Sequence, residues 1–107
     1  MSDTLSLKLQ ALADPTRRAI LAQLKIGENS VNELARPFAM SLPAISKHIK
    51  VLETAGLITR RVSAQSRPCK LSEGGLNEVA VWIHDYHEMW EQRLDRLENY
   101  LESLKGD

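Results

Sequence analysis

Apolar residues between Ser30 and Gly56 recur at the spacing of two short helices that are joined by a tight turn. The first helix opens with a capping box, because Ser30 is followed three residues later by Glu33. Residues 38–40 are expected to form the turn. The apolar residues on one face of this first helix are Val31, Leu34, Ala35 and Phe38.

The second helix of the pair is expected to begin after the capping residue Ser41 and to end before Gly56. Pro43 falls in its first turn, where a missing N–H group costs little. Its inner apolar residues are Ile45, Ile49 and Leu52. Two short helices with a tight connection are typical of a helix-turn-helix.

The outer face of the second helix is polar and cationic. At 100° per residue, the side chains roughly opposite Ile45, or flanking that face, are Pro43, Ser46, Lys47, His48, Lys50 and Thr54. A recognition helix presents its first residues to base edges in the major groove and its later cations to phosphates. A solvated helix face is the alternative for these positions, and His48 could bond either a phosphate or a neighbouring helix.

A β-hairpin is predicted directly after Gly56, because residues 57–63 and 67–72 form two short alternating runs around a small polar loop. Three cations, Arg60, Arg61 and Arg67, cluster near that loop. Such a wing could lie along the phosphate backbone of a duplex. Pro68 cannot donate to a strand ladder, so the hairpin is expected at the margin of the domain.

Charge is sorted along the chain although the net charge is zero. Residues 1–35 hold four basic and four acidic residues, whereas residues 36–70 hold seven basic residues and one acidic residue, a net +6. Residues 71–107 hold three basic and nine acidic residues, a net −6. The positive segment coincides with the helix-turn-helix and the hairpin, which favours a polyanionic partner such as double-stranded DNA.

Two further helices are predicted before Ser30. Leu5, Leu9 and Leu12 form the apolar face of the first, and Asp14 caps the second, which ends at Gly27. The adjacent pair Arg17 and Arg18 could touch phosphate or could simply be solvated.

The last predicted helix, from Glu73 to Leu104, keeps an apolar 3-to-4 spacing over about seven turns. A stripe of this length needs a partner, so we expect a homodimer in which this helix and the first one form the interface. The alternative is a monomer whose long helix covers its own sheet. A dimer would hold two recognition helices about 34 Å apart and would favour an imperfect palindrome. The expected interface residues are Leu5, Leu9, Trp82, Tyr86, Trp90, Leu94, Leu97 and Leu101.

Length and composition favour one small domain, residues 1–107, that is mainly α with a two-stranded wing. The sequence carries no apolar run long enough for a membrane span and no signal peptide. The single Cys69 cannot form an intrachain disulfide, which agrees with a cytoplasmic location. No nucleophile elbow, P-loop, dinucleotide fingerprint or zinc-protease motif occurs, so we expect no enzyme, no catalytic residue and no cofactor.

Three motifs together resemble the ArsR-type winged helix-turn-helix repressors of bacteria: ADPTRRAIL from Ala13, LPAISKHIKVLE from Leu42, and AGL from Ala55. The resemblance covers nearly the whole chain and implies a homodimeric transcriptional regulator, usually a repressor. It implies that DNA is read by Ser41, Leu42, Pro43, Ser46, Lys47 and His48, with Arg61 and Arg67 in the wing. Lys50 joins them from its place on the outer face. Ser66 stands where many relatives have a wing-tip glycine, so the turn is expected to differ there.

Many relatives sense metals, but the thiolate site of the family is not expected here, because residues 33–38 contain no cysteine or histidine and one Cys cannot supply two sulfurs. Four residues of the last helix, His84, His87, Glu88 and Glu91, form i, i+4 pairs that could ligate a metal or could be solvated. Cys69 could be a buried apolar residue or a sensing thiol. We therefore expect a DNA-binding repressor, with a winged-helix protein-interaction module as the alternative and the inducer left open.

Overall fold

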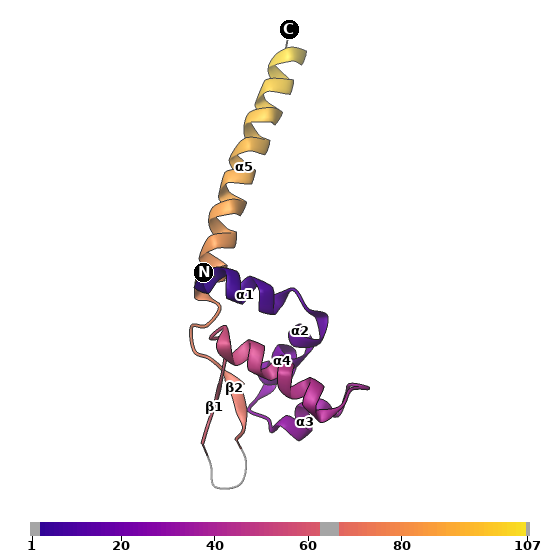
Figure 1. The fold of residues 1–107 in the computed structure, drawn as a ribbon. Helices are drawn as coiled ribbons and strands as arrows, with labels where there is room; N and C mark the ends of the chain where they lie inside the picture. The colour runs from indigo at the N-terminus through magenta and orange to yellow at the C-terminus, as the bar shows by residue number, and fades with distance from the viewer. Residues whose placement is uncertain (1–2, 63–66, 107) are drawn as a thin grey trace. The chain divides into compact units, whose positions relative to one another are not determined.

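The computed structural model describes residues 3–62 and 67–106 and contains five helices and one two-stranded sheet (Figure 1). The elements in chain order are α1 (Thr4–Leu12), α2 (Pro15–Ile26), α3 (Val31–Ala35), α4 (Leu42–Thr54), β1 (Ile58–Arg60), β2 (Cys69–Leu71) and α5 (Asn77–Lys105). The mainly helical fold with a small hairpin is therefore confirmed. The chain divides into two compact units, Met1–Leu76 and Asn77–Asp107. Among the described helices, none is both long enough and apolar enough to cross a membrane.

Aspartate side chains begin the first two helices. An Asp3 carboxylate oxygen accepts the Ser6 N–H at 2.6 Å, and an Asp14 carboxylate oxygen accepts the Arg17 N–H at 3.0 Å. These backbone hydrogen bonds hold the pKa of both carboxyl groups below its usual range. The expected cap at Asp14 and the expected end of α2 at Gly27 are both confirmed.

The caps of the helix-turn-helix are also as expected. The Ser30 hydroxyl accepts the Glu33 N–H, while the Glu33 carboxylate accepts the Ser30 N–H, each at 3.2 Å. The Ser41 hydroxyl accepts the Ala44 N–H at 3.3 Å and starts α4. However, α3 ends at Ala35 instead of continuing to Phe38. The reason is Pro37, which has no N–H to continue the helical hydrogen bonds.

The core of the first unit lies between α1–α4 and the hairpin. Its fully buried large side chains are Ile20, Leu34, Ile45, Ile49, Leu52, Ile58 and Cys69. The half-buried residues that pack against them include Leu7, Leu12, Val31 and Phe38. The inner face expected for α4 is therefore confirmed, and it fixes which side chains of α4 point outward.

The hairpin is antiparallel and pairs Ile58 with Leu71 and Arg60 with Cys69. One more backbone bond extends it, because Arg61 N–H donates to the Pro68 carbonyl at 3.0 Å. On its other side, Cys69 exchanges two backbone hydrogen bonds with Asn29, at 2.8 and 3.0 Å. The loop before α3 is thus attached to the hairpin, a pairing that local sequence patterns did not predict.

The last helix begins at Asn77, so the expected start at Glu73 is wrong. Gly74 has a φ of 73°, which is a left-handed conformation that breaks the helical path. At Gly75 a Cβ atom would lie 2.7 Å from the Gly56 carbonyl oxygen. These two glycines shape a turn before the helix instead of its first turn.

Candidate nucleic-acid interface

The outward face of α4 carries most of the residues expected to bind DNA. Ile45, Ile49 and Leu52 hold the opposite face in the core. Six of the seven expected residues on and before α4 are exposed: Ser41, Leu42, Pro43, Ser46, Lys47 and Lys50. The side chain of Leu42 is exposed although it is apolar, with 47% of its surface accessible. An exposed apolar residue at the start of a recognition helix is suited to contact a thymine methyl group.

His48 is the exception on this face, because it is turned toward α2. Its Nδ1 atom lies 3.3 Å from Nη1 of Arg17 and 3.8 Å from Oδ2 of Asp14. Only 21% of its side chain is accessible. Of the two roles open to His48, the structure therefore supports contact with the neighbouring helix.

Arg17 and Arg18 hold the end of α1. Arg17 donates from Nε to the Ala11 carbonyl at 2.8 Å and from Nη2 to the Gln10 carbonyl at 3.0 Å. Arg18 donates from Nη1 to the Leu12 carbonyl at 2.7 Å. The last carbonyls of a helix have no partner within it, so the two arginines cap α1. This role was not among those expected for the pair.

The two wing arginines expected to bind DNA, Arg61 and Arg67, are both exposed. Arg61 is already paired, because its Nη2 atom lies 2.8 Å from Oε1 of Glu28. The Arg60 guanidinium donates to the Arg67 carbonyl at 3.4 Å, which ties the two strands together near the loop. Ser66, the remaining expected residue of the wing, lies outside the described residues.

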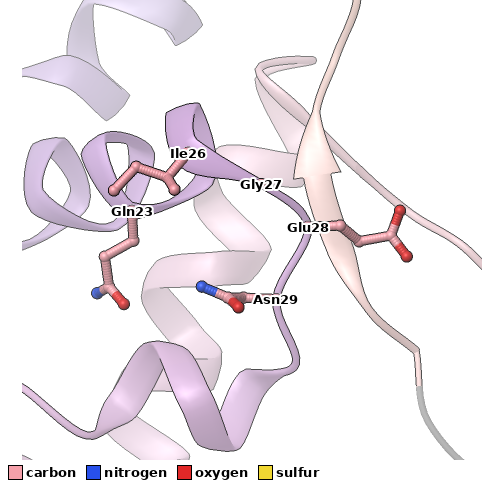
Figure 2. Close-up of a pocket in the computed structure, with 5 residues that line it drawn as sticks. All are labelled: Gln23, Ile26, Gly27, Glu28 and Asn29. Atoms are coloured by element: carbon pink, nitrogen blue, oxygen red, sulfur yellow. The ribbon is translucent and has the colours of Figure 1, made fainter.

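A shallow pocket lies at the loop between α2 and α3 and is lined by Gln23, Ile26, Gly27, Glu28 and Asn29 (Figure 2). The Gln23 amide donates to the Leu34 carbonyl at 3.1 Å and so links α2 to α3. In Figure 2 the Glu28 side chain points away from Gln23 and Asn29, toward the hairpin. This loop therefore supplies the partner of Arg61.

Cys69 is fully buried, and burial raises the pKa of its thiol, although the charge of Arg60 opposes that effect. A buried thiol with a raised pKa is a poor nucleophile, so the structure favours the packing role. In residues 3–62 and 67–106, no three His, Cys, Asp or Glu side chains gather as they would around a metal ion. His84 lies 3.8 Å from Glu88 and His87 lies 3.7 Å from Glu91, as two separate i, i+4 pairs.

The long helix α5 presents its apolar residues to solvent. Every side chain from Ala80 to Lys105 is exposed, and the rings of Trp82 and Tyr86 pack with their centroids 4.6 Å apart. The six residues of α5 expected at a dimer interface are between 40% and 62% exposed: Trp82, Tyr86, Trp90, Leu94, Leu97 and Leu101. Leu5 and Leu9 of α1 are half-buried.

Comparison with known proteins gives a consistent picture. Residues 12–61 match a family model described as a helix-turn-helix domain. The chain is 40% identical over 98 residues to the HTH-type transcriptional regulator Rv2034 of Mycobacterium tuberculosis, covering 92% of this chain and 88% of that protein. It is 32% identical over 77 residues to the transcriptional repressor SdpR of Bacillus subtilis, covering 72% of this chain and 86% of that protein.

Solved structures agree with these sequence relatives. The crystal structure of an ArsR family transcriptional regulator superposes with a TM-score of 0.78 at 42% identity, covering 83% of this chain and 98% of that one. The homodimeric winged helix-turn-helix DNA-binding domain of a possible ArsR-family regulator from Mycobacterium bovis gives a TM-score of 0.65 at 25% identity, with 84% of each chain covered.

Proposed function

The chain belongs to the ArsR family of helix-turn-helix transcriptional regulators, and from this premise we propose that it represses transcription by binding a palindromic operator as a homodimer. The observation that carries the proposal is the outward face of α4, where Ser46, Lys47 and Lys50 are all exposed while the opposite face is buried. The relatives are named transcriptional regulators and repressors. Their names favour DNA binding over the alternative of a protein-interaction module.

In this proposal α4 enters the major groove with its N-terminal end toward the bases. Ser41, Leu42, Pro43 and Ser46 read base edges, while Lys47 and Lys50 contact phosphates. The hairpin lies along the backbone and adds phosphate contacts from Arg61, Ser66 and Arg67. His48 contributes through α2, because its imidazole faces Arg17.

The second copy of the chain covers the apolar stripe of α5 together with α1. Exposed aromatic and leucine residues over such a length, on a chain of 107 residues, favour burial against an equivalent surface. The homodimeric domain from Mycobacterium bovis, which shares this fold, supports the same assembly. Residues 1–107 then act as one winged helix-turn-helix domain with a dimerisation helix at each end.

Repression by this protein needs no chemistry. A dimer bound at a promoter excludes the transcription machinery by occupying the DNA, so we propose a cytoplasmic, non-catalytic regulator. The buried Cys69 thiol and the two separate His–Glu pairs of α5 support a regulator without a thiolate metal site.

The test is a titration of the full chain against a labelled duplex from its own upstream region, repeated as the salt concentration rises. Affinity should fall linearly in log–log form, with a slope that reports several released counterions. Lys47→Ala should weaken binding and reduce the slope by about one per subunit. Lys25→Ala is the matched control, because Lys25 is an exposed lysine at the far end of α2. Equal affinity for the upstream fragment and for random duplex would contradict the proposal.

A further inference from the structure

One guanidinium group joins three helices in the first unit. Arg17, on α2, donates two hydrogen bonds to the C-terminal carbonyls of α1, at Gln10 and Ala11. Its remaining terminal nitrogen, Nη1, lies 3.3 Å from Nδ1 of His48 in the middle of α4. The backbone of Arg17 is itself held by the Asp14 cap. The position of α4 is thereby linked to the end of α1 through a single side chain.

We propose that Arg17 and His48 are positioning residues that fix the recognition helix α4 relative to α1, and so set the spacing between the two recognition helices of the dimer. This inference rests on the proposed function, in which α1 contributes Leu5 and Leu9 to the interface between subunits. Neither residue needs to touch DNA in this role. Their effect is on which arrangement of half-sites the dimer accepts.

The hydrogen-bond chemistry suits a fixed link. The guanidinium is always protonated, so it can only donate, and its planar fork sets the directions of its bonds. Nδ1 of His48 is then the acceptor, which assigns the imidazole proton to Nε2. Asp14, whose Oδ2 atom is 3.8 Å from the same Nδ1, keeps a negative charge beside the cation.

Apolar packing alone does not provide this precision. Leu7, Ala11 and Leu12 pack α1 against the core, but such contacts are non-directional and tolerate small rotations and shifts. Hydrogen bonds from one planar group to two helices allow much less movement. A small shift at α1 would therefore be carried to α4 instead of being absorbed between them.

Arg18 offers a matched control, because it also caps α1. It donates to the Leu12 carbonyl at 2.7 Å, and in the described part of the chain it hydrogen-bonds α1 alone. Arg18→Gln therefore removes a cap from α1 without removing a link to α4. Arg17→Gln removes both.

The experiment uses the full chain and a duplex carrying a palindromic site that the unmodified protein selects from a random pool. Dissociation constants are measured by fluorescence anisotropy on this duplex and on versions with the half-sites moved one base pair closer or farther apart. We expect Arg17→Gln and His48→Leu each to lose about tenfold or more on the original spacing, while discriminating less between spacings. The salt slope should stay unchanged, Arg18→Gln should stay within about twofold, and the double variant should be no worse than the weaker single one.

Three results would overturn the proposal. A salt slope reduced by about one per subunit in Arg17→Gln would identify a direct phosphate contact. Equal effects of Arg17→Gln and Arg18→Gln would reduce the role to capping of α1. Unchanged spacing preference in both Arg17→Gln and His48→Leu would remove the link to the dimer.

Thermal unfolding of each variant separates misfolding from mispositioning. If Arg17→Gln is unfolded at the assay temperature, Arg17→Lys replaces it, because Lys keeps the charge but lacks the planar fork. If the unmodified protein selects no site, the proposed function fails. A double-mutant cycle between Arg17 and His48 on the unfolding equilibrium then decides whether the link exists, since additive effects would contradict it.

Discussion

The ion pair between Glu28 and Arg61 predicts that Glu28→Gln tightens DNA binding. Nη2 of Arg61 lies 2.8 Å from Oε1 of Glu28, and the same guanidinium is proposed to contact a phosphate. A phosphate must then replace the carboxylate as the partner of Arg61. Part of the binding free energy is spent on breaking a contact within the protein, and removing the charge of Glu28 abolishes that loss.

The size of the effect follows from how exposed the pair is. The side chains of Arg61 and Glu28 are 65% and 35% accessible, so the solvent screens their attraction. Exposed pairs contribute about 0.2–1 kcal/mol, which corresponds to a gain of about 1.4-fold to fivefold for each subunit. Since a dimer presents the pair twice, Glu28→Gln should tighten binding by about twofold to 30-fold.

The assay is anisotropy on the operator duplex at about 0.1 M salt, where charges more than about 10 Å apart are screened. Arg61→Gln and the double variant Glu28→Gln/Arg61→Gln complete a cycle. In the Arg61→Gln background the gain from Glu28→Gln should shrink to the direct repulsion between Glu28 and DNA. Weaker binding by Glu28→Gln, or an equal gain in both backgrounds, would refute the reasoning, because the pair would then position the hairpin or play no part.

Three further predictions concern assembly and stability. Trp90→Arg places a charge on the exposed apolar stripe of α5 and should give a monomer in sedimentation at micromolar concentration; an unchanged mass would count against the interface. Gly75→Ala should destabilise the fold by about 1 kcal/mol or more in chemical unfolding, because its Cβ would lie 2.7 Å from a backbone oxygen, whereas Gly27→Ala, which meets no atom within 4 Å, should be neutral or stabilising. The lowered pKa of Asp14 means that its contribution to stability is present at neutral pH and is lost as the pH falls below about 4, so the stability difference between the unmodified protein and Asp14→Ala should shrink on acidification. A constant difference from pH 7 to 3 would contradict it.

The helix-turn-helix could be predicted closely because its signals are local. Ser30, Glu33 and Ser41 cap helices through bonds to residues three positions away, and Gly56 ends α4 with a φ of 80°. The buried and exposed faces of α4 follow from the helical period in the same way. Most of the candidate interface could therefore be assigned from the sequence.

The features that the sequence did not provide depend on contacts between distant segments. The start of α5 at Asn77 reflects the turn at Gly74 and the close approach of Gly75 to the Gly56 backbone. The pairing of Asn29 with Cys69 joins residues 40 positions apart. The inward orientation of His48 depends on Arg17, and no periodicity of α4 contains that partner.

The account's central claim, that a two-fold pair of α4 helices grips one side of a duplex, is tested most directly by hydroxyl-radical footprinting on the upstream fragment. It predicts two protected patches on one side of the duplex with their centres about 10–10.5 base pairs apart, or a multiple of that distance, and loss of both patches in Lys47→Ala at the same protein concentration. A single protected patch, uniform protection along the fragment, or an unchanged footprint in Lys47→Ala would contradict it.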